Sequence, residues 1–299
     1  MKKLLFIGCN HDQLPYLLEL KKHQFEIIGT DMNSNAPGKE LCNKFYQVGY
    51  DDCYGLIDIG IKEKFNLDDT IFTASAQFAH KGAAHFANKF GIDYPTEKNI
   101  DICLDKTLFY NKFQKLGIPI PETSFITNKE DFVSTIKKLD EKSSYYLKSD
   151  FSKNPNYVYR FNPENVKVDD IFWGRDRYLR NHYILQKEFI GESLRINIYG
   201  ERYNVFQFEP MKKISDKKKY IETVGVINSL LKYIKDLGLD RWLIKFDIIL
   251  NNENYVVLDV GLDPPFRMVK ESKLQGINFA KYYVKQYLSQ KVDYPESLD

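Results

Sequence analysis

The stretch WLIKFDIILNNENYVVLDVGLDPPFR, residues 242–267, decides the fold of this chain. Its apolar and β-branched residues predict two strands, Trp242–Leu250 and Tyr255–Val260, joined by a polar turn. Each strand carries one carboxylate in an otherwise apolar setting, Asp247 on the first and Asp259 on the second. The stretch therefore predicts an antiparallel hairpin with two acidic side chains.

Two arrangements of these aspartates are open. Paired strands can bring both side chains onto one face, where their like charges repel each other. A bound cation relieves this repulsion, and hard oxygen ligands favour Mg²⁺ held jointly with a substrate phosphate. Alternatively, the two side chains face opposite sides of the hairpin and are solvated. The hairpin alone does not decide between a metal site and this second arrangement.

The composition is that of an ordinary globular protein. The 299 residues allow two or three packed units, and 43% are hydrophobic and 28% charged. The net charge of +2 and the lack of a basic motif disfavour nucleic acid binding. Four cysteines without CxxC spacing indicate free thiols in a reducing compartment. The first apolar run is too short for a signal or membrane segment, so we expect a cytoplasmic protein.

Residues 1–100 alternate between strand and helix patterns. Apolar runs at 4–8, 25–29 and 70–73 suit buried parallel strands, and the spacing GxGxxG is absent. Parallel sheets bind ligands at the carboxyl ends of their strands, although ordinary turns also occur there. The candidate substrate-side positions at this edge are Gly8, Asp31 and Ala74–Ser75.

The middle of the chain carries basic residues in unusual places. A helix opens at Asp105-Lys106, and a strand at 145–148 carries Lys148. A lysine on an apolar strand reaches water or an anion, or it protects a sheet edge. The polar, basic stretch 151–182 is either a flap over an anionic ligand or a solvated insertion.

The last third is predicted to be rich in strands. Three strands with tight turns are expected at 183–189, 194–199 and 202–208. A helix follows at about 217–236, then the hairpin, and then a C-terminal helix from about 269 to 288.

Taken in order, these parts resemble the ATP-grasp superfamily of carboxylate–amine or thiol ligases. The similar pieces are Asp31, Asn33 and Ala36–Gly38, DK at 105–106, GIPIP at 117–121, ILQKEFIGESLRINIYG at 184–200, FDII at 246–249 and VLDVGLDPP at 257–265. The resemblance implies an α/β fold, with a leading Rossmann-like parallel domain at 1–100 and a two-lobed ATP-grasp module, α+β in its lobes. Its first lobe is expected at 101–185 and its C-terminal lobe, with the metal site, at 186–299.

The resemblance also implies a function. Such a protein joins a carboxylate to an amine, using ATP and Mg²⁺ to form an acylphosphate and releasing ADP. The residues that match nucleotide-binding positions are Lys106, Lys148, Gln186, Lys187, Glu188, Phe189 and Glu192. The expected metal ligands are Asp247, Asp259 and Asp263, and the residues expected to hold the substrate carboxylate or acylphosphate are Arg195 and Arg267.

The chain departs from the family pattern at two places. The second metal strand reads Asp259-Val260-Gly261 where the family usually has Glu-x-Asn, and residues 149–160 contain no glycine where the family has a glycine-rich flap. Basic residues such as Lys153 or Arg160 could replace the flap contacts. A kinase or carboxylase on the same fold and a non-catalytic nucleotide-binding homologue are therefore alternatives. The expected partners are small-molecule carboxylates and amines, without nucleic acid or membrane, and a homodimer is left open.

Overall fold

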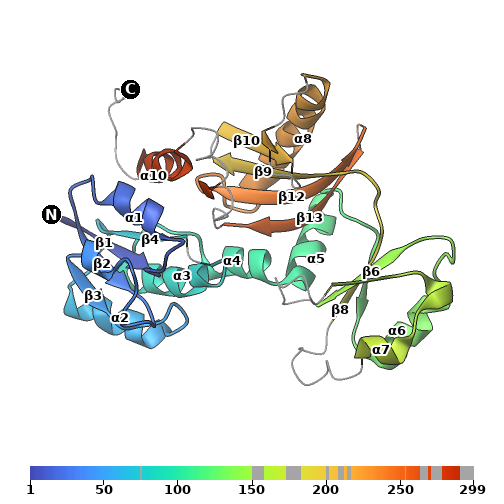
Figure 1. Cartoon of the computed structure of the whole chain (residues 1–299), viewed down its shortest axis with the longest axis horizontal. Helices are drawn as coiled ribbons and strands as arrows, with labels where there is room; N and C mark the ends of the chain where they lie inside the picture. Colours follow the sequence, from blue (N-terminus) through green and yellow to red (C-terminus); the bar gives the residue numbers. More distant parts are fainter. Residues whose placement is uncertain are drawn as a thin grey trace.

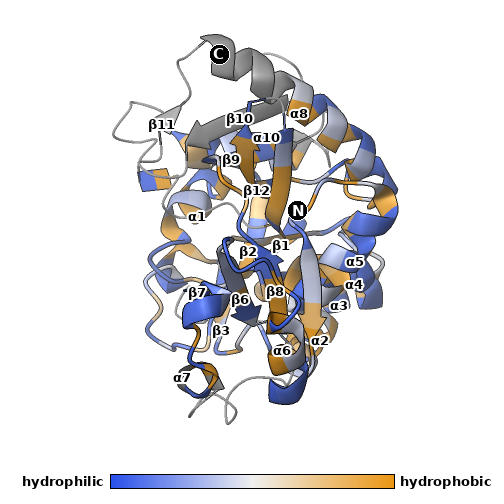
Figure 2. Ribbon diagram, turned by 90° about the vertical axis from the view of Figure 1, so that its right-hand side faces the viewer, coloured by the Kyte–Doolittle hydropathy of each residue, from blue (hydrophilic) through white to orange (hydrophobic). Residues whose placement is uncertain are grey.

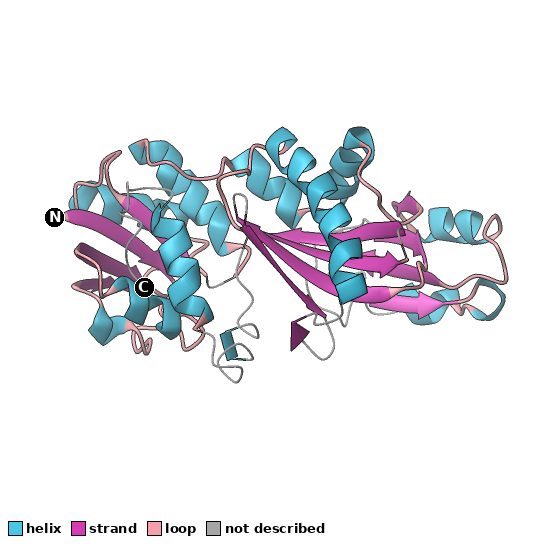
Figure 3. Ribbon diagram, turned by 90° about the horizontal axis from the view of Figure 1, so that it is seen from above, coloured by secondary structure: helices cyan, strands magenta, loops and turns pink. Residues whose placement is uncertain are grey.

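The strands in the described part of the chain form three sheets, which follow one another along the sequence (Figure 1). The computed structural model describes residues 1–74, 76–149, 158–172, 183–199, 202–207, 212–213, 217–252, 254–262, 269–270 and 278–289. Viewed from above, the leading sheet lies at one end of an elongated molecule, and the two later sheets follow towards the other end (Figure 3).

The leading sheet is parallel, as the sequence predicts. Its elements are β1 (Lys2–Ile7), α1 (Leu14–Leu20), β2 (Phe25–Thr30), η1 (Lys39–Leu41), β3 (Lys44–Tyr46), α2 (Cys53–Lys62), β4 (Thr70–Thr73) and α3 (Ala79–Phe90). The strand order is β3-β2-β1-β4. Side chains of β1 alternate between two cores, with Leu4 and Phe6 in one and Leu5 and Ile7 in the other. Both faces of the sheet are therefore covered, which explains the continuous apolar runs.

The small antiparallel sheet has the order β5-β8-β6-β7. Its strands are β5 (Thr123–Ile126), β6 (Tyr145–Ser149), β7 (Val158–Phe161) and β8 (Tyr183–Lys187), and its helices are α6 (Lys129–Ile136) and α7 (Val168–Phe172). Within the polar stretch 151–182, for which the sequence predicted no regular element, residues 158–161 form β7 and residues 168–172 form α7. Phe161 packs edge-on against Phe132 of α6, and this buried contact stabilises β7. The polar residues on both sides of β7 hide the strand pattern in the sequence.

The large antiparallel sheet has the order β11-β10-β9-β12-β13. Its elements are β9 (Glu192–Tyr199), β10 (Arg202–Gln207), β11 (Lys212–Lys213), α8 (Lys217–Asp236), β12 (Ile244–Asn251) and β13 (Asn254–Gly261). The strands predicted at 183–208 divide between two sheets, because the chain crosses over at Gly191. A Cβ atom on Gly191 would lie 2.5 Å from the Leu250 carbonyl oxygen, so only glycine allows this close crossing.

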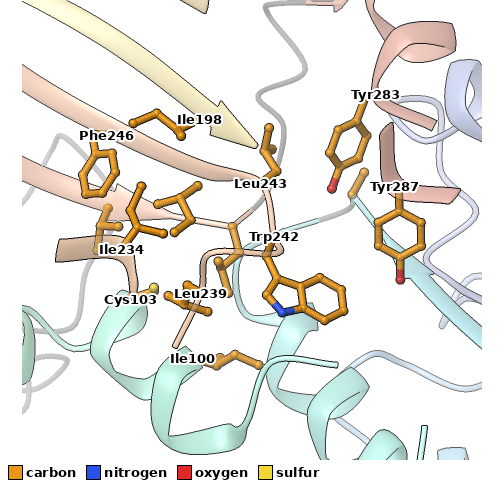
Figure 4. Close-up of a cluster of buried hydrophobic side chains, with 14 of the residues drawn as sticks. Ile100, Cys103, Ile198, Ile234, Leu239, Trp242, Leu243, Phe246, Tyr283 and Tyr287 are labelled. Carbon is orange, nitrogen blue, oxygen red and sulfur yellow. The ribbon is translucent and has the colours of Figure 1, made fainter. Parts of the chain in front are cut away.

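Helices and aromatic side chains join the leading sheet to the large one. The connecting helices are α4 (Glu97–Leu104), α5 (Lys106–Leu116) and α10 (Phe279–Ser289), which covers the last part of the predicted C-terminal helix. Trp242 packs against Tyr94 and Tyr287. Figure 4 shows Trp242 and Tyr287 within the same apolar cluster. The Gln77 amide nitrogen donates to the carbonyls of Cys103 and Val260, at 2.6 and 2.9 Å. Residues from both ends of the chain therefore share one core.

The distribution of hydropathy agrees with this core. Figure 2 shows apolar residues along central strands such as β8 and β12, and hydrophilic residues on the outer loops and helix faces. Among the described residues, no helix has both the length and the hydropathy needed to span a membrane.

Candidate active site

A cavity of about 660 Å³ lies between the small and the large antiparallel sheets. One wall comes from β6, β7 and β8, and the other from β9, β12 and β13. The segment Glu188–Gly191 links β8 to β9 and lines the end of the cavity; we call it the hinge. The lining residues are Pro121, Tyr146, Lys148, Val158, Arg160, Gln186, Lys187, Glu188, Phe189, Ile190, Gly191, Ser193, Ile249 and Leu258. Five of the seven predicted nucleotide-binding residues are thus brought together here.

Lys148 is one of three cationic residues that line this cavity, with Arg160 and Lys187. Its Nζ donates to Gln186 Oε1 at 2.8 Å, and Gln186 Nε2 donates to Thr123 Oγ1 at 2.9 Å. The pKa of Lys148 is lowered from 10.5 to about 8, mainly by burial and also by the charge of Lys106, while the charge of Asp259 opposes both effects. The three charged groups are therefore close enough to act on one another. An anion entering the cavity would gain from this underneutralised ammonium group.

The hinge is fixed by its backbone and by an ion pair. The Lys187 N–H donates to the Glu122 carbonyl and the Glu188 N–H to the Ser144 carbonyl, at 3.1 and 2.8 Å. The guanidinium of Arg160 donates from Nε and Nη2 to the two oxygens of Glu188, at 3.0 and 2.8 Å. Hydrogen bonds from Arg160 hold the pKa of Glu188 below its usual range. Glu188 therefore stays ionised at the mouth of the cavity.

Two aspartates and an arginine form a row on one face of the large sheet. Asp247 of β12 lies directly opposite Asp259 of β13 and directly opposite Arg195 of β9. Arg195 donates from Nε and Nη2 to the two Asp247 oxygens, at 2.6 and 2.7 Å. The ladder between β12 and β13 is irregular here: Ile248 pairs with Val257, so Leu258 has no partner in the register. This bulge puts Asp259 across from Asp247, and we call the two residues the carboxylate pair.

A second polar row lies one pleat further along the same face. Lys245 of β12 pairs with Asn197 of β9 and with Gly261 of β13. Both polar side chains are buried, at 8% and 0% exposure. Residues two apart on a strand share a face, so Lys245 stands on the same side as Asp247. Sequence reasoning missed Lys245, although a lysine two residues before an aspartate in an apolar strand was a usable signal.

Sequence comparison identifies no relative of this chain. No family model matches it, and no curated protein matches it.

Comparison with solved structures identifies the fold. N5-carboxyaminoimidazole synthetase of Staphylococcus aureus, complexed with ADP, is 12% identical with a TM-score of 0.74, over 98% of this chain and 78% of that one. D-alanine–D-alanine ligase of Bacillus anthracis is 13% identical with a TM-score of 0.67, over 97% of both chains. The biotin carboxylase domain of the Hydrogenobacter thermophilus 2-oxoglutarate carboxylase, with MgADP, is 13% identical with a TM-score of 0.72, over 98% and 71%. These are ATP-grasp enzymes. The chain has the ATP-grasp fold.

Within the ATP-grasp fold, the other predicted residues are placed as follows. Lys106 begins α5 outside the cavity lining, but its charge reaches Lys148. Ser193 lines the cavity, whereas its neighbour Glu192 is not among the lining residues and alternates to the opposite face of β9. The predicted residues Asp263 and Arg267, and Lys153 in the expected flap, lie outside the described residues.

The carboxyl edge of the leading sheet has a structural network of its own. The two oxygens of Asp31 accept from the backbone N–H groups of Cys9 and Asn33, at 2.8 and 2.9 Å. Gly8 has a φ of +88°, and its N–H donates to the Thr30 carbonyl. Asp31 therefore stabilises the loops at this edge, where the sequence predicted substrate-side positions. Ser75, another of those positions, lies outside the described residues.

The carboxylate pair suits a hard cation. Two aspartates opposite each other offer the oxygen ligands that Mg²⁺ takes, and Mg²⁺ is commonly completed by substrate phosphates and water. No group of three or more acidic, histidine or cysteine residues that could hold a metal occurs in the described part of the chain. The candidate metal ligands among the described residues are therefore Asp247 and Asp259. The positive charge of Arg195 offsets part of their negative charge.

Proposed function

We propose that this chain is an ADP-forming, ATP-dependent ligase that joins a carboxylate to an amine through an acylphosphate, with Mg²⁺ as cofactor. The observation that carries the proposal is the carboxylate pair, Asp247 opposite Asp259, on the sheet that forms one wall of a cavity containing Lys148. The fold supports it, since matched structures include a D-alanine–D-alanine ligase and complexes with ADP or MgADP.

The chemistry has two steps. A carboxylate is a poor electrophile, so its oxygen first attacks the terminal phosphorus of ATP, and ADP leaves with the electrons of the broken P–O bond. The amine nitrogen then attacks the carbonyl carbon of the acylphosphate, inorganic phosphate leaves, and the amine loses a proton. Phosphoryl transfer needs positioning and charge neutralisation more than covalent help from the protein. The acylphosphate must also be kept from water.

Each candidate residue has a role in this scheme. Lys106 and Lys148 neutralise the nucleotide phosphates, and the hinge with Gln186 and Lys187 holds the base and ribose. Asp247 and Asp259, with Asp263 as a further proposed ligand, hold Mg²⁺, which when bound neutralises phosphate charge. Arg195 and Arg267 grip the substrate carboxylate or acylphosphate, because a guanidinium group matches planar oxyanions.

The test removes one charge of the carboxylate pair at a time. Asp247→Asn and Asp259→Asn are assayed for Mg·ATP-dependent ADP release over a panel of carboxylates and amines, with the exposed Asp58→Asn on α2 as the matched control. We expect each site variant to lose about 100-fold or more in rate with an unchanged far-UV circular dichroism spectrum, because phosphate charge is no longer neutralised. Full activity in both variants would contradict the metal assignment.

The panel also tests the ligase proposal itself. Mg·ATP binding without ADP release on every pair would favour a non-catalytic nucleotide-binding protein. ADP release without a joined product would favour a kinase or carboxylase.

Several further properties belong to the same proposal. We propose a leading domain at 1–100, a first lobe at 101–185 and a C-terminal lobe at 186–299. The leading sheet lies within the first range and the large sheet within the third, and the small sheet lies within the second apart from the last two residues of β8. We also propose that the substrates are small molecules and that the protein acts in the cytoplasm, which suits four free cysteines. A homodimer is compatible with this proposal, and sedimentation analysis would test it.

A further inference from the structure

Two cysteines meet at the carboxyl end of the leading sheet. Cys9 lies two residues after the end of β1, and Cys42 directly follows η1. Their sulfur atoms lie 4.0 Å apart, in hydrogen-bonding contact. A Cβ atom on Gly29 of β2 would lie 2.3 Å from the sulfur of Cys42 and 3.0 Å from that of Cys9. Both sulfurs therefore converge over a strand position that only glycine leaves open.

The two thiols are not equivalent. Cys9 is fully buried, whereas Cys42 is partly exposed. The hydrogen bond from Cys9 lowers the pKa of Cys42, and the charge of Lys21 lowers it further, while burial opposes both effects. The same hydrogen bond, together with burial, raises the pKa of Cys9. Cys42 is thus the more accessible sulfur and the one that loses its proton more readily, and Cys9 is a buried neighbour in contact with it.

We propose that Cys9 and Cys42 form an oxidation site in which a hydroperoxide converts the two thiols into a disulfide. The thiolate of Cys42 attacks one oxygen of hydrogen peroxide, the O–O bond breaks, and the sulfur becomes a sulfenic acid as hydroxide takes up a proton and leaves as water. The sulfur of Cys9 then attacks the Cys42 sulfur, the S–O bond breaks, and a second water leaves. Two thiols are oxidised by two electrons, and one peroxide is reduced to two waters.

The disulfide would act on the segment from Asp31 to Cys42. This segment is already tied to Cys9, whose N–H donates to Asp31 Oδ2 and whose carbonyl accepts from the Gly38 N–H, both at 2.8 Å. The Cys42 sulfur also lies 3.4 Å from the Gly38 carbonyl oxygen, to which it donates in its protonated form. A covalent bond would fix this segment at the edge of the sheet where α/β proteins bind ligands. The proposal is independent of the proposed ligase activity.

Mass spectrometry tests the site on the full-length protein. The reduced protein is treated with hydrogen peroxide, the remaining thiols are blocked with N-ethylmaleimide, and a non-reducing digest is mapped. We expect a loss of about 2 Da and a cross-linked peptide pair containing Cys9 and Cys42, both reversed by dithiothreitol. A Cys9→Ser variant should instead accumulate a dimedone adduct at Cys42, because the resolving thiol is gone. Cys42→Ser should give neither product.

Cys53 provides the matched control. It is also partly exposed, but burial raises its pKa, so its thiolate is less available. A Cys53→Ser variant should keep the cross-link, and in the wild type Cys42 should react with peroxide about tenfold faster than Cys53. Two results would overturn the proposal: oxidation of wild-type Cys42 to sulfinic acid without a cross-link to Cys9, or preferential oxidation of Cys53. The wild-type measurement is decisive even where a variant fails to fold.

Discussion

If this chain binds Mg·ATP as proposed, Lys148 should make nucleotide affinity depend on pH. Burial lowers its pKa from 10.5 to about 8 in the nucleotide-free protein, with Lys106 adding to this effect and Asp259 opposing it. Bound phosphates favour the charged ammonium and raise this pKa, so binding takes up a proton wherever the free lysine is neutral. About nine-tenths of the free lysine is protonated at pH 7 and about one-tenth at pH 9. Affinity for Mg·ATP should therefore fall about tenfold over this range, or about 1.4 kcal/mol.

Isothermal titration calorimetry measures this linkage. At pH 8, titrations in buffers of different ionisation enthalpy should show uptake of about half a proton per nucleotide, because half of the free lysine is neutral there. Lys148→Met should bind more weakly at pH 7 and lose the pH dependence between 7 and 9. Lys232→Met, on an exposed position of α8, is the control and should keep it. An affinity of the wild type that is flat between pH 7 and 9 would refute the reasoning.

The same variant should gain stability without nucleotide. A pKa lowered from 10.5 to about 8 means that the buried charge costs folding on the order of 3 kcal/mol. Because the folded state loses this proton before the unfolded state does, Lys148 makes stability rise with pH between about 8 and 10.5. Denaturant unfolding of Lys148→Met at pH 7 should therefore show a higher midpoint than the wild type. A lower midpoint would mean that the hydrogen bond to Gln186 outweighs the burial of charge.

Three further variants test the remaining parts of the site. Arg160→Ala should weaken Mg·ATP binding several-fold in calorimetry, because the ion pair of Arg160 with Glu188 positions the hinge. Thermal unfolding should be nearly unchanged, because this ion pair is exposed. Unchanged nucleotide affinity would contradict the positioning role. Lys245→Met should keep nucleotide affinity but lower the rate of ADP release by about 100-fold. The reason is that a cation on the face of the carboxylate pair stabilises negative charge that develops in the transition state. An equal loss of nucleotide affinity would contradict this role. Gly191→Ala should destabilise the protein by about 1–3 kcal/mol in urea unfolding, because its Cβ would meet the Leu250 carbonyl; wild-type stability would contradict the crossing.

The hydrophobic pattern of the sequence predicted the strands and helices that are buried on one face or on both faces. The runs at 4–8, 25–29 and 70–73 became the parallel strands β1, β2 and β4, and the helix predicted at 217–236 is α8. These patterns report only how a segment is buried, and not which strand becomes its neighbour. The assignment of β8 and β9 to different sheets therefore could not be read from their similar sequences.

The sequence analysis did not predict helix α2 at Cys53–Lys62. Gly55 and Gly60 weaken its intrinsic helix propensity by about 1 kcal/mol each relative to alanine. Tertiary packing overrides this cost: a Cβ on Gly60 would lie 2.2 Å from the Phe90 ring, so the glycine allows α2 to approach α3 closely. This packing involves a residue 30 positions further along the chain. Helix propensity depends only on the local sequence and therefore cannot predict it.

The carboxylate pair depends on one extra residue in β13, Leu258, which no sequence pattern predicts. Counted from the turn, the register Asn251↔Asn254 to Ile248↔Val257 is regular, and its continuation would pair Asp259 with Phe246. Phe246 is 1% exposed and belongs to the apolar core, so that register would bury Asp259 among hydrophobic side chains. The bulge at Leu258 shifts β13 by one residue, which brings Asp259 opposite Asp247 and lets Leu258 line the cavity. The hydroxyl of Tyr110 donates to the Leu258 carbonyl at 2.7 Å and thereby supports the bulge. The register without the bulge would place the two aspartates on opposite faces, as in the second arrangement that the sequence left open, but with Asp259 buried and not solvated. The contact from Tyr110 of α5 supports the register that places both on one face.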